Sequence, residues 1–377
     1  MRRRKAPDHP DRPVGRPAVE RERTSRRIRR WIIRAEFAPR SRLPAHRELA
    51  RRLDANVFVV QLALQQLAEE GFVELRGRDG TYVAATPPHL RRFALAFPAP
   101  WDAPGFVRFW TVLADEARRM TAEGEAEFEL YSCANRALPE AADYRRLVDD
   151  VRRHRLAGIL FAGPPFLVAG TPILREAGIA RVAIMARGSF PGVAALEMAG
   201  EAEFLQRAVT LLRERGRRRL AWLGVPGNRW EEIPALVRTL GVESRPEWVH
   251  VGNQSHPGPA ANLMRLLARL PAEERPDSLV ITDDNLVGPA CQGLRSGSVR
   301  VPQDMEVVAH CNFPAPASDL PIHWLGYDIQ NLLRTAVEFM RRRRNGGDSP
   351  RSFRVPLEFE REVQARQAAP QLAASHG

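Results

Sequence analysis

The sequence predicts a multidomain protein in which a compact N-terminal α+β block precedes a longer α/β region. The block is amphipathic from residue 18 to residue 86 and ends at Thr86-Pro87-Pro88, because successive prolines stop both helix and strand pairing. From Phe93 onward, short apolar runs alternate with longer amphipathic stretches, which is typical of βαβ units around a parallel sheet. The length of 377 residues also exceeds what one ordinary core accommodates.

Changes in composition predict the domain boundaries. Residues 1–17 are basic, rich in proline and without a hydrophobic period, so we expect a disordered arm. The N-terminal block then spans 18–86, and a linker follows over 87–92. The α/β region is expected over 93–362, with a disordered tail over 363–377.

Positive charge is concentrated at the N-terminal end of the chain. Residues 1–90 contain 20 Lys and Arg against 11 Asp and Glu, whereas the remaining residues contain 37 basic and 34 acidic groups. Most of the net charge of +12 therefore lies on the N-terminal end of the chain, that is, on the arm and the block together. This asymmetry favours a polyanionic partner for that end.

The composition argues against a membrane, secreted or metal-binding protein. No apolar run approaches the roughly 18 residues of a membrane helix, and no apolar stretch follows the basic Met1–Lys5 segment, so we expect no signal peptide. The three cysteines, Cys133, Cys291 and Cys311, are scattered and odd in number, which fits a reducing cytoplasm. We expect a cytoplasmic protein with no metal, no cofactor and no membrane partner.

Two helices are expected at the start of the block. The first is predicted over Val19–Ala35, where Ile28, Trp31 and Ile32 share one face at helical spacing. The second is predicted over Pro44–Leu53, since proline is well suited to the first turn of a helix.

A third helix and a hairpin complete the block. Asn56 is a suitable N-cap for a helix over Val57–Glu70, and Gly71 is expected to end that helix. Phe72–Val83, with its turn at Gly77–Gly80, predicts a β-hairpin. Two short helices in tandem followed by a hairpin form a winged helix-turn-helix, which places the third helix where it enters the major groove of duplex DNA.

The α/β region is expected to contain at least seven buried strands and five amphipathic helices. The apolar runs lie at 93–97, 128–131, 158–161, 182–185, 220–223, 279–282 and 307–309. The amphipathic stretches lie at 106–122, 141–154, 201–215, 260–269 and 328–344. Strand alternating with helix indicates parallel sheets covered on both faces.

The N-terminal block resembles the GntR family of bacterial regulators over most of residues 19–85. The resemblance is carried by Arg42-Leu-Pro-Ala-His-Arg-Glu-Leu-Ala50, Ala63-Leu64, Leu67, Glu70-Gly71 and Gly80-Thr-Tyr-Val83. It implies that Arg47 contacts phosphate, that the start of the third helix contacts base edges, and that Arg78 reaches the minor groove or backbone from the wing. Arg42 and Gly80 are expected at the same interface.

The start of the third helix departs from the family pattern. The family usually has Ser/Thr-Arg there, whereas this chain has Asn56-Val-Phe-Val-Val60, so Val57 replaces an arginine suited to guanine. Asn56 and Gln61 are suited to adenine, and Val57 or Phe58 to a thymine methyl group. We therefore expect an operator weighted toward A·T pairs. Two alternatives stay open: Phe58 belongs to the core, or the block serves protein–protein contact only.

The rest of the chain resembles the LacI/GalR-type effector domain, a relative of periplasmic sugar-binding proteins. The resemblance spans about 90–362 and is carried by Gly216–Gly224, Pro276–Asp284 with Val299–Val308, and Arg229–Ile233 ending in Gly241-Val242. It implies a two-lobed α/β domain of the type I periplasmic-binding-protein class. Ligand would bind at the carboxyl ends of the strands.

The same resemblance implies the ligand contacts. These are an aromatic wall after the first strand and polar groups after later strands, namely Trp101, Phe106, Arg229, Asp283, Cys311 and Asn312. The usual Gly-aromatic-Asp-Asp is replaced by Ala309-His-Cys-Asn312, which argues against a neutral sugar bound in the common way, and Arg229 would suit an anionic group. As alternatives, Trp101 packs in the core, or Asp284 caps the next helix.

No enzyme motif accompanies these features. GxSxG, P-loop, HExxH and strand-associated GxGxxG patterns are missing from the sequence, and an aminotransferase-like module would need a Schiff-base lysine, whereas Lys5 is the only lysine. We expect a ligand-responsive transcriptional repressor, a homodimer that binds double-stranded operator DNA and a sugar-like effector. The alternatives are a DNA-binding regulator without ligand response and an extracytoplasmic solute-binding protein, which the fused DNA-binding block disfavours.

Overall fold

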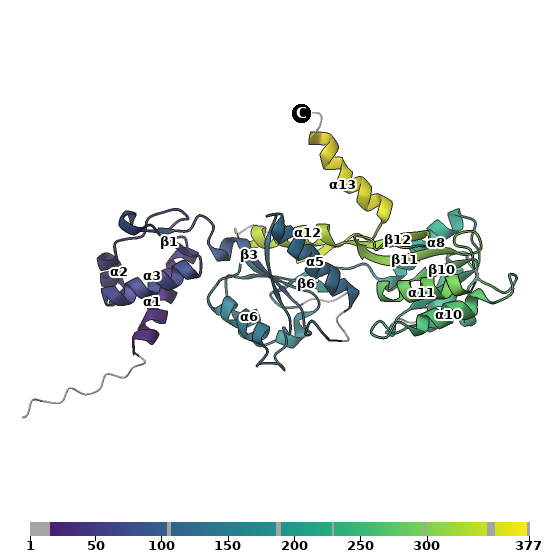
Figure 1. The fold of residues 1–377 in the computed structure, drawn as a ribbon, viewed down its shortest axis with the longest axis horizontal. Helices are drawn as coiled ribbons and strands as arrows, with labels where there is room; N and C mark the ends of the chain where they lie inside the picture. The colour runs from purple at the N-terminus through teal and green to yellow at the C-terminus, as the bar shows by residue number, and fades with distance from the viewer. Residues whose placement is uncertain are drawn as a thin grey trace, which may run out of the picture. The chain divides into compact units, whose positions relative to one another are not determined.

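The computed structural model describes residues 16–103, 107–185, 190–227, 230–297, 299–344 and 351–374 (Figure 1). Its contacts divide the chain into two compact units. Unit 1 is the chain up to Arg92 together with Asp149–Ala157, and unit 2 is Phe93–Val148 with the chain from Gly158 onward. The predicted arm lies outside the described residues up to residue 15, and helix α1 begins at Arg16.

Unit 1 is a winged helix-turn-helix, as the sequence predicts. Its elements in chain order are α1 (Arg16–Ile33), α2 (His46–Leu53), α3 (Val57–Glu69), β1 (Val73–Leu75), β2 (Thr81–Val83) and α4 (Pro88–Arg91). Strands β1 and β2 pair antiparallel, with Val73 opposite Val83 and Leu75 opposite Thr81. Helix α2 begins two residues after Pro44, because Ala45 is still extended and its carbonyl accepts the first helical hydrogen bonds, from the amides of Glu48 and Leu49.

Apolar side chains at helical spacing form the core of unit 1. Ile28, Leu49, Leu64, Leu67 and Phe72 are fully buried, and they come from all three main helices and the start of the wing. Burial of each such side chain contributes about 1.5–3 kcal/mol. The helices of this small domain are therefore held mainly by one shared apolar cluster.

A buried ion pair links the first and third helices of unit 1. The side chains of Arg29 and Glu70 are 2% and 6% exposed, and the Arg29 guanidinium donates to the Glu70 carboxylate. Glu70 also accepts from Gln66 at 3.1 Å and from Arg153 at 2.9 Å. Burial opposes ionisation of Glu70, but these donors outweigh it and hold the pKa of its carboxyl below the ordinary value.

Unit 2 contains two six-stranded sheets, which define two lobes. In lobe 1 the strand order is β13-β7-β6-β5-β3-β4. Its strands are β3 (Arg92–Ala96), β4 (Glu127–Tyr131), β5 (Gly158–Phe161), β6 (Ala180–Met185), β7 (Ala194–Glu197) and β13 (Ser352–Arg354). Its helices are α5 (Arg108–Ala122), α6 (Ala142–Arg152), α7 (Pro172–Arg175) and α12 (Ile329–Arg344).

In lobe 2 the strand order is β14-β12-β11-β10-β8-β9. Its strands are β8 (Leu220–Gly224), β9 (Val249–Val251), β10 (Ser278–Ile281), β11 (Glu306–Phe313), β12 (Ile322–Asp328) and β14 (Glu358–Phe359). Its helices are α8 (Glu201–Glu214), α9 (Ile233–Thr239), α10 (Pro259–Ala268), α11 (Asp284–Ser296) and α13 (Glu360–Ala374). The pairs from β9 to β12 are parallel, and the edge strand β14 is antiparallel to β12.

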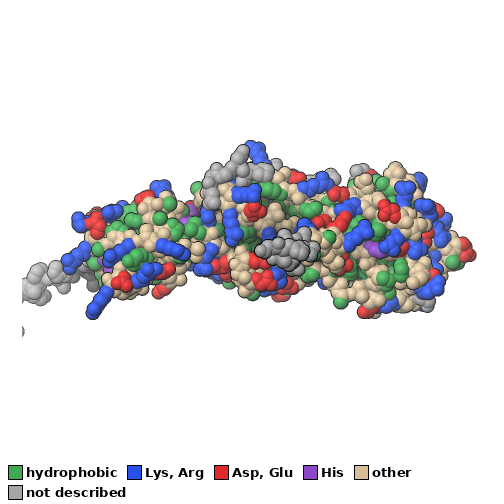
Figure 2. Space-filling model, turned by 90° about the horizontal axis from the view of Figure 1, so that it is seen from above, with side chains coloured by type: hydrophobic (Ala, Val, Ile, Leu, Met, Phe, Trp, Pro, Cys, Tyr) green, Lys and Arg blue, Asp and Glu red, His purple; other side chains and the backbone are tan. Residues whose placement is uncertain are grey.

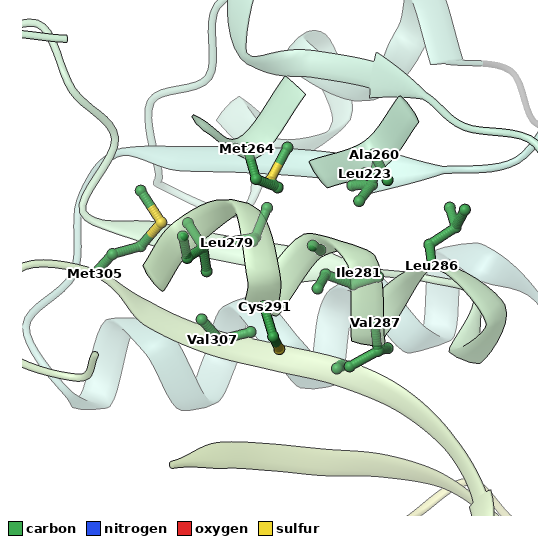
Figure 3. Packing of buried hydrophobic residues seen from close by; sticks show 14 of the residues in the cluster. Leu223, Ala260, Met264, Leu279, Ile281, Leu286, Val287, Cys291, Met305 and Val307 are labelled. Carbon is green, nitrogen blue, oxygen red and sulfur yellow. The ribbon is translucent and has the colours of Figure 1, made fainter. Parts of the chain in front are cut away.

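The two faces of the lobe 2 sheet carry different side chains. Leu223, Leu279, Ile281 and Val307 lie on one face and pack against α10 and α11 in an apolar cluster (Figure 3). Because side chains alternate along a strand, the intervening residues lie on the opposite face. Several polar groups of the candidate effector site lie on that second face.

The chain passes between the lobes three times, after β7, after β12 and after β13. This connectivity confirms the predicted two-lobed α/β fold. All seven predicted apolar runs form strands and all five amphipathic stretches form helices. Helix α11 is not among the five amphipathic stretches, because Gly288 and Pro289 interrupt its pattern, although proline is accommodated in its interior. It is the helix that one alternative expected Asp284 to cap.

The prediction of a disordered tail after residue 362 is wrong. Helix α13 covers Glu360–Ala374 and is anchored to lobe 2. Val363 is 4% exposed, Arg366 forms ion pairs with Asp328 and Glu358, and Glu362 binds Arg207. The tail is polar and poor in large apolar residues, so composition alone concealed these anchors. In the part of the chain that is described, no helix has the length and apolar character to cross a membrane.

The contact between α10 and α11 generates a first prediction. A Cβ atom at Gly293 would lie 2.2 Å from the Ala261 carbonyl oxygen, so this glycine lets the two helices approach closely. We expect Gly293→Ala to lower the free energy of unfolding by about 1–3 kcal/mol, despite the better helix propensity of alanine. Urea titration followed by circular dichroism measures the change.

The exposed neighbour Gln292 provides the control for this prediction. Gln292→Ala is expected to change the free energy of unfolding by less than about 0.5 kcal/mol. Equal effects of the two substitutions would contradict the role assigned to Gly293.

Candidate DNA-binding and effector sites

The start of α3 presents apolar side chains to solvent. Val57 is 42% and Phe58 is 62% exposed, whereas the following Val59 and Val60 are buried in the domain core. Gln61, one turn farther along the helix, is also exposed. The alternative that Phe58 is a core residue is therefore wrong, and Phe58 lies on the exposed surface at the start of the third helix.

Asn56 is the N-cap of α3, as predicted. Its Oδ1 accepts a hydrogen bond from the backbone N–H of Phe58 at 2.8 Å. A bidentate contact with adenine uses both the oxygen and the nitrogen of the amide. The oxygen already serves the helix, so a base contact by Asn56 would rely mainly on Nδ2.

Three exposed arginines lie in the segments that precede and follow α3 in the chain. Arg47 lies on α2, Arg78 lies in the turn of the wing, and Arg42 precedes α2. The Arg42 guanidinium lies across Gly80, where a Cβ atom would be 2.9 Å from its Nε, and Gly80 has φ +96°. Gly80 therefore serves both the turn and the placement of Arg42.

The charges of these three arginines are available to a partner. Within the described residues none of the three forms an ion pair, whereas the neighbouring Arg51 and Arg52 are both paired with Glu48. In the space-filling view, basic side chains lie across the visible surface of the winged-helix domain (Figure 2). Unpaired guanidinium groups beside a recognition helix are suited to DNA phosphates.

In unit 2, polar side chains collect at the carboxyl ends of the lobe 2 strands. Asp283 caps α11, because its Oδ1 accepts from the backbone N–H and the Nδ2 of Asn285 at 2.9 and 2.7 Å. Asp284 is 9% exposed and its Oδ2 accepts from Asn312 Nδ2 at 2.8 Å. The capping role that the sequence left open for Asp284 thus belongs to Asp283.

Lobe 1 reaches this cluster through the start of α5. The backbone N–H of Arg108 donates to Asn285 Oδ1 at 3.0 Å, and Arg108 Nε lies 3.5 Å from Asp284 Oδ2. Sequence reasoning missed Arg108, because no local pattern relates residues that are 177 positions apart. Desolvation by burial raises the pKa of both Asp283 and Asp284, while Asn285, Asn312 and Arg108 oppose the rise.

Several enclosed polar atoms adjoin the cluster on the second face of the sheet. Among the described residues, Trp222 Nε1, Thr282 Oγ1, His310 Nδ1 and Asn312 Oδ1 have no hydrogen-bond partner. Loss of hydration lowers the pKa of His310 to about 4, so its ring is neutral near pH 7. Enclosed polar atoms without partners are costly and indicate room for water or a polar ligand.

Cys311 does not belong to this site. It is 1% exposed and packs in the apolar cluster beneath α10 and α11, on the face opposite the neighbouring polar groups. Burial raises the pKa of its thiol far above the ordinary value, so the thiol stays protonated. The prediction that Cys311 contacts the ligand is therefore wrong, whereas that for Asn312 remains.

A cavity of about 430 Å³ continues along the same edge of lobe 2. It lies between α5 of lobe 1, the ends of β11 and β12, and helix α13. Its lining combines apolar groups with carboxylates and amides, including Glu116, Arg119, Phe313, Asp328, Glu360 and Gln364. The volume falls within the usual range for small-molecule sites.

The remaining predicted contacts divide into two groups. Trp101 is 40% exposed, packs against Phe97 at 5.2 Å between ring centroids and has the Arg118 guanidinium 5.8 Å from its ring. Trp101 is therefore partly exposed and partly packed against its neighbours, and its role as an aromatic wall stays a prediction. Phe106 and Arg229 lie outside the described residues.

Two family models match the chain. The model "Bacterial regulatory proteins, gntR family" matches residues 20–83, and the model "Periplasmic binding protein-like domain" matches residues 209–363. The chain carries a GntR-type helix-turn-helix domain followed by a periplasmic-binding-protein-like domain. The match to the GntR family model therefore points to a transcriptional regulator. No curated protein matches the sequence significantly.

Solved LacI-family regulators share the fold of unit 2. A Lactobacillus casei regulator with bound glucose is 17% identical, with 71% of this chain and 98% of that chain covered and a TM-score of 0.51. A LacI-family regulatory protein from Chloroflexus aggregans is 15% identical, with 71% and 96% covered and a TM-score of 0.53. A regulator from Arthrobacter sp. FB24 in complex with lactose is 13% identical, with 71% and 97% covered and a TM-score of 0.53.

The capping role of Asp283 generates a second prediction. Asp283→Ala removes the acceptor for the Asn285 N–H and is expected to lower the free energy of unfolding by about 0.5–2 kcal/mol. Asp283→Asn keeps an equivalent cap, so the measured loss should be only a few tenths of a kcal/mol. Urea unfolding of both variants provides the comparison, and equal losses would contradict the cap.

Proposed function

We propose that this chain is a bacterial repressor that binds operator DNA as a homodimer and responds to a small sugar-like molecule bound between its two lobes. The observation that carries the proposal is the exposed start of α3 beside three unpaired arginines, on a GntR-type domain joined to a two-lobed binding domain. The chemistry of the two sites supports separate partners: a polyanion for unit 1 and a small polar molecule for unit 2.

On the DNA, Arg47, Arg78 and Arg42 would neutralise phosphates and fix the register of the domain. The exposed Val57 and Phe58 would contact thymine methyl groups, while Gln61 is suited to adenine. A homodimer would match the two-fold symmetry usual for operators. The fused domain pair supports regulation by a ligand better than it supports a pure DNA-binding role.

In unit 2 the ligand would bind where α5 faces the strand ends of lobe 2. The L. casei and Arthrobacter structures contain glucose and lactose, which supports a sugar or sugar derivative as the ligand of this chain. Regulation would follow from linkage, since a ligand that weakens operator binding must itself be bound more weakly in the presence of operator, by the same factor.

A regulator that has lost its ligand response is the second candidate. The direct contact of Arg108 with Asp284 and Asn285 favours it, because this contact joins the lobes without a ligand. The two candidates differ in whether any small molecule changes the affinity for operator.

The unpaired arginines generate a third prediction. Arg47→Ala and Arg78→Ala should each weaken binding to all duplex sequences and reduce the slope of log K against log salt by about 1, because each removes one phosphate contact. Fluorescence anisotropy at several salt concentrations measures both quantities. The exposed Arg269, which is the C-cap of α10, provides the control, since Arg269→Ala should leave the slope unchanged. An unchanged slope for both wing and helix variants would contradict DNA binding by this face.

The start of α3 generates a fourth prediction. Binding-site selection with the wild-type chain should return A·T pairs opposite α3, because no arginine is available there for bidentate contact with guanine. Val57→Arg should introduce a guanine preference at one position of each half-site, by about 1–3 kcal/mol. Obligate guanines opposite α3 in the wild-type selection would contradict the assignment.

A further inference from the structure

We propose that the effector carries a protonated amine, which binds the acceptor cluster formed by Asp283, Asp284 and Asn312 in lobe 2. The inference rests on the proposed function, because it names the chemical class of the ligand for the same site. It narrows the expected sugar-like effector to a cationic small molecule such as an amino sugar or an amino alcohol, in place of an anionic group suited to Arg229.

The cluster presents hydrogen-bond acceptors that lack donors. Asn312 is 2% exposed, and its Nδ2 is already bound to Asp284. Its Oδ1 is enclosed and has no partner among the described residues. Because Oδ1 and Nδ2 belong to the same amide group, this unpartnered oxygen is part of the side chain that binds the carboxylate. Asp283 uses Oδ1 for the helix cap, which leaves Oδ2 with no donor among the described residues.

The charge of the cluster is poorly compensated. The Asp284 side chain is 4% exposed, and burial of a carboxylate without a cation is costly. Within the described residues, Arg108 alone brings a cationic side chain within 4.0 Å of either carboxylate, at 3.5 Å from Asp284 and without a hydrogen bond. The Arg108 side chain is 38% exposed, so water screens this ion pair.

Arg108 belongs to lobe 1, whereas both carboxylates belong to lobe 2. The compensation of Asp284 therefore depends on the approach of the two lobes. A primary ammonium group has three N–H donors and is small enough to serve several acceptors at once. Its three donors match in number the acceptors of the cluster, namely Asp284, Asp283 Oδ2 and Asn312 Oδ1, whereas Arg108 makes no hydrogen bond with Asp284. We infer that the amine of the ligand takes the place of Arg108 at Asp284.

The alternatives fit the same groups less well. A carboxylate or phosphate on the ligand would add a like charge beside two buried carboxylates. A neutral polyol would satisfy the acceptors but leave the charge of Asp284 without a new cation. An amine is thus the group that both donates hydrogen bonds to the free acceptors and compensates the charge of Asp284.

The test uses pairs of probes that differ only in the amine. Glucosamine is compared with glucose, and ethanolamine with ethylene glycol, by calorimetric titration of the full chain near pH 7 at constant ionic strength. In at least one pair the amine should bind about tenfold or more tightly than its neutral partner, the usual gain from charge-assisted hydrogen bonds. Asp283→Asn and Asp284→Asn should each remove most of this difference, and Arg108→Ala should increase it by removing the competing guanidinium. Glu247→Gln, at an exposed carboxylate of lobe 2, is the control and should change nothing.

Several outcomes would overturn the inference: equal binding within both pairs, no binding of either amine, or an amine preference that survives in both Asp variants. If Asp284→Asn does not fold, Asp283→Asn decides, because it keeps the cap of α11. The same samples are titrated with the operator obtained by selection. Operator binding without an amine preference refutes this inference alone, whereas wild-type chain that binds no operator refutes the proposed function.

Discussion

A buried carboxylate must find partners, and this constraint organises both units of the chain. In unit 1, Glu70 is satisfied by Arg29, Gln66 and Arg153, so the end of α3 is tied to α1 and to the segment after α6. In unit 2, Asp284 is satisfied by Asn312 and approached by Arg108. The two carboxylates differ in one respect. Glu70 accepts hydrogen bonds from three side chains, whereas the cation nearest to Asp284 is a residue of the other lobe.

This difference separates a fully paired buried carboxylate from a partly compensated one. Removing one partner of a fully paired buried group costs about 3–5 kcal/mol, which suits a permanent joint such as Glu70 with Arg29. Asp284 is held by amide hydrogen bonds from Asn312 at 2.8 Å and from Asn285 at 3.5 Å, and by a partly exposed contact with Arg108 at 3.5 Å. A ligand can compete with Arg108 for Asp284, because a contact of that strength is easily replaced.

Local patterns predicted the elements, but not the contacts between distant elements. The spacing of apolar residues predicted α1, α5, α8 and the buried strands, because the apolar face of a helix and the apolar run of a strand are both visible in neighbouring residues of the sequence. The start of the third helix was also predicted, since Asn56 is followed directly by the residues it caps. By contrast, α11 contains Gly and Pro, and α13 has few apolar residues, so their stability comes from packing partners that lie elsewhere in the chain.

The candidate effector site shows the same limit at the level of single residues. The resemblance identified Asp283 as a site residue. It did not show whether Asp283 or Asp284 caps the helix, because the two adjacent acids differ only in the orientation of their side chains in the folded chain. Cys311 was predicted at the site because it neighbours Asn312, but alternation along β11 turns the two side chains to opposite faces. The position of a residue after a strand predicts the edge of the sheet at which the residue lies. The face of the sheet on which its side chain lies depends on the register of the strand.

The exposed apolar start of α3 is the clearest case in which local sequence and tertiary structure disagree. Val57 and Phe58 have the composition of a core segment, and their successors Val59 and Val60 are indeed buried. Leaving Phe58 62% exposed forgoes part of the roughly 1.5–3 kcal/mol that its burial would contribute. Because α3 contacts the domain core through one face, residues on its opposite face at the N-terminus remain outside, whatever their hydrophobicity. Under the proposed function, the thymine methyl groups of a major groove would cover this large apolar side chain in the bound state.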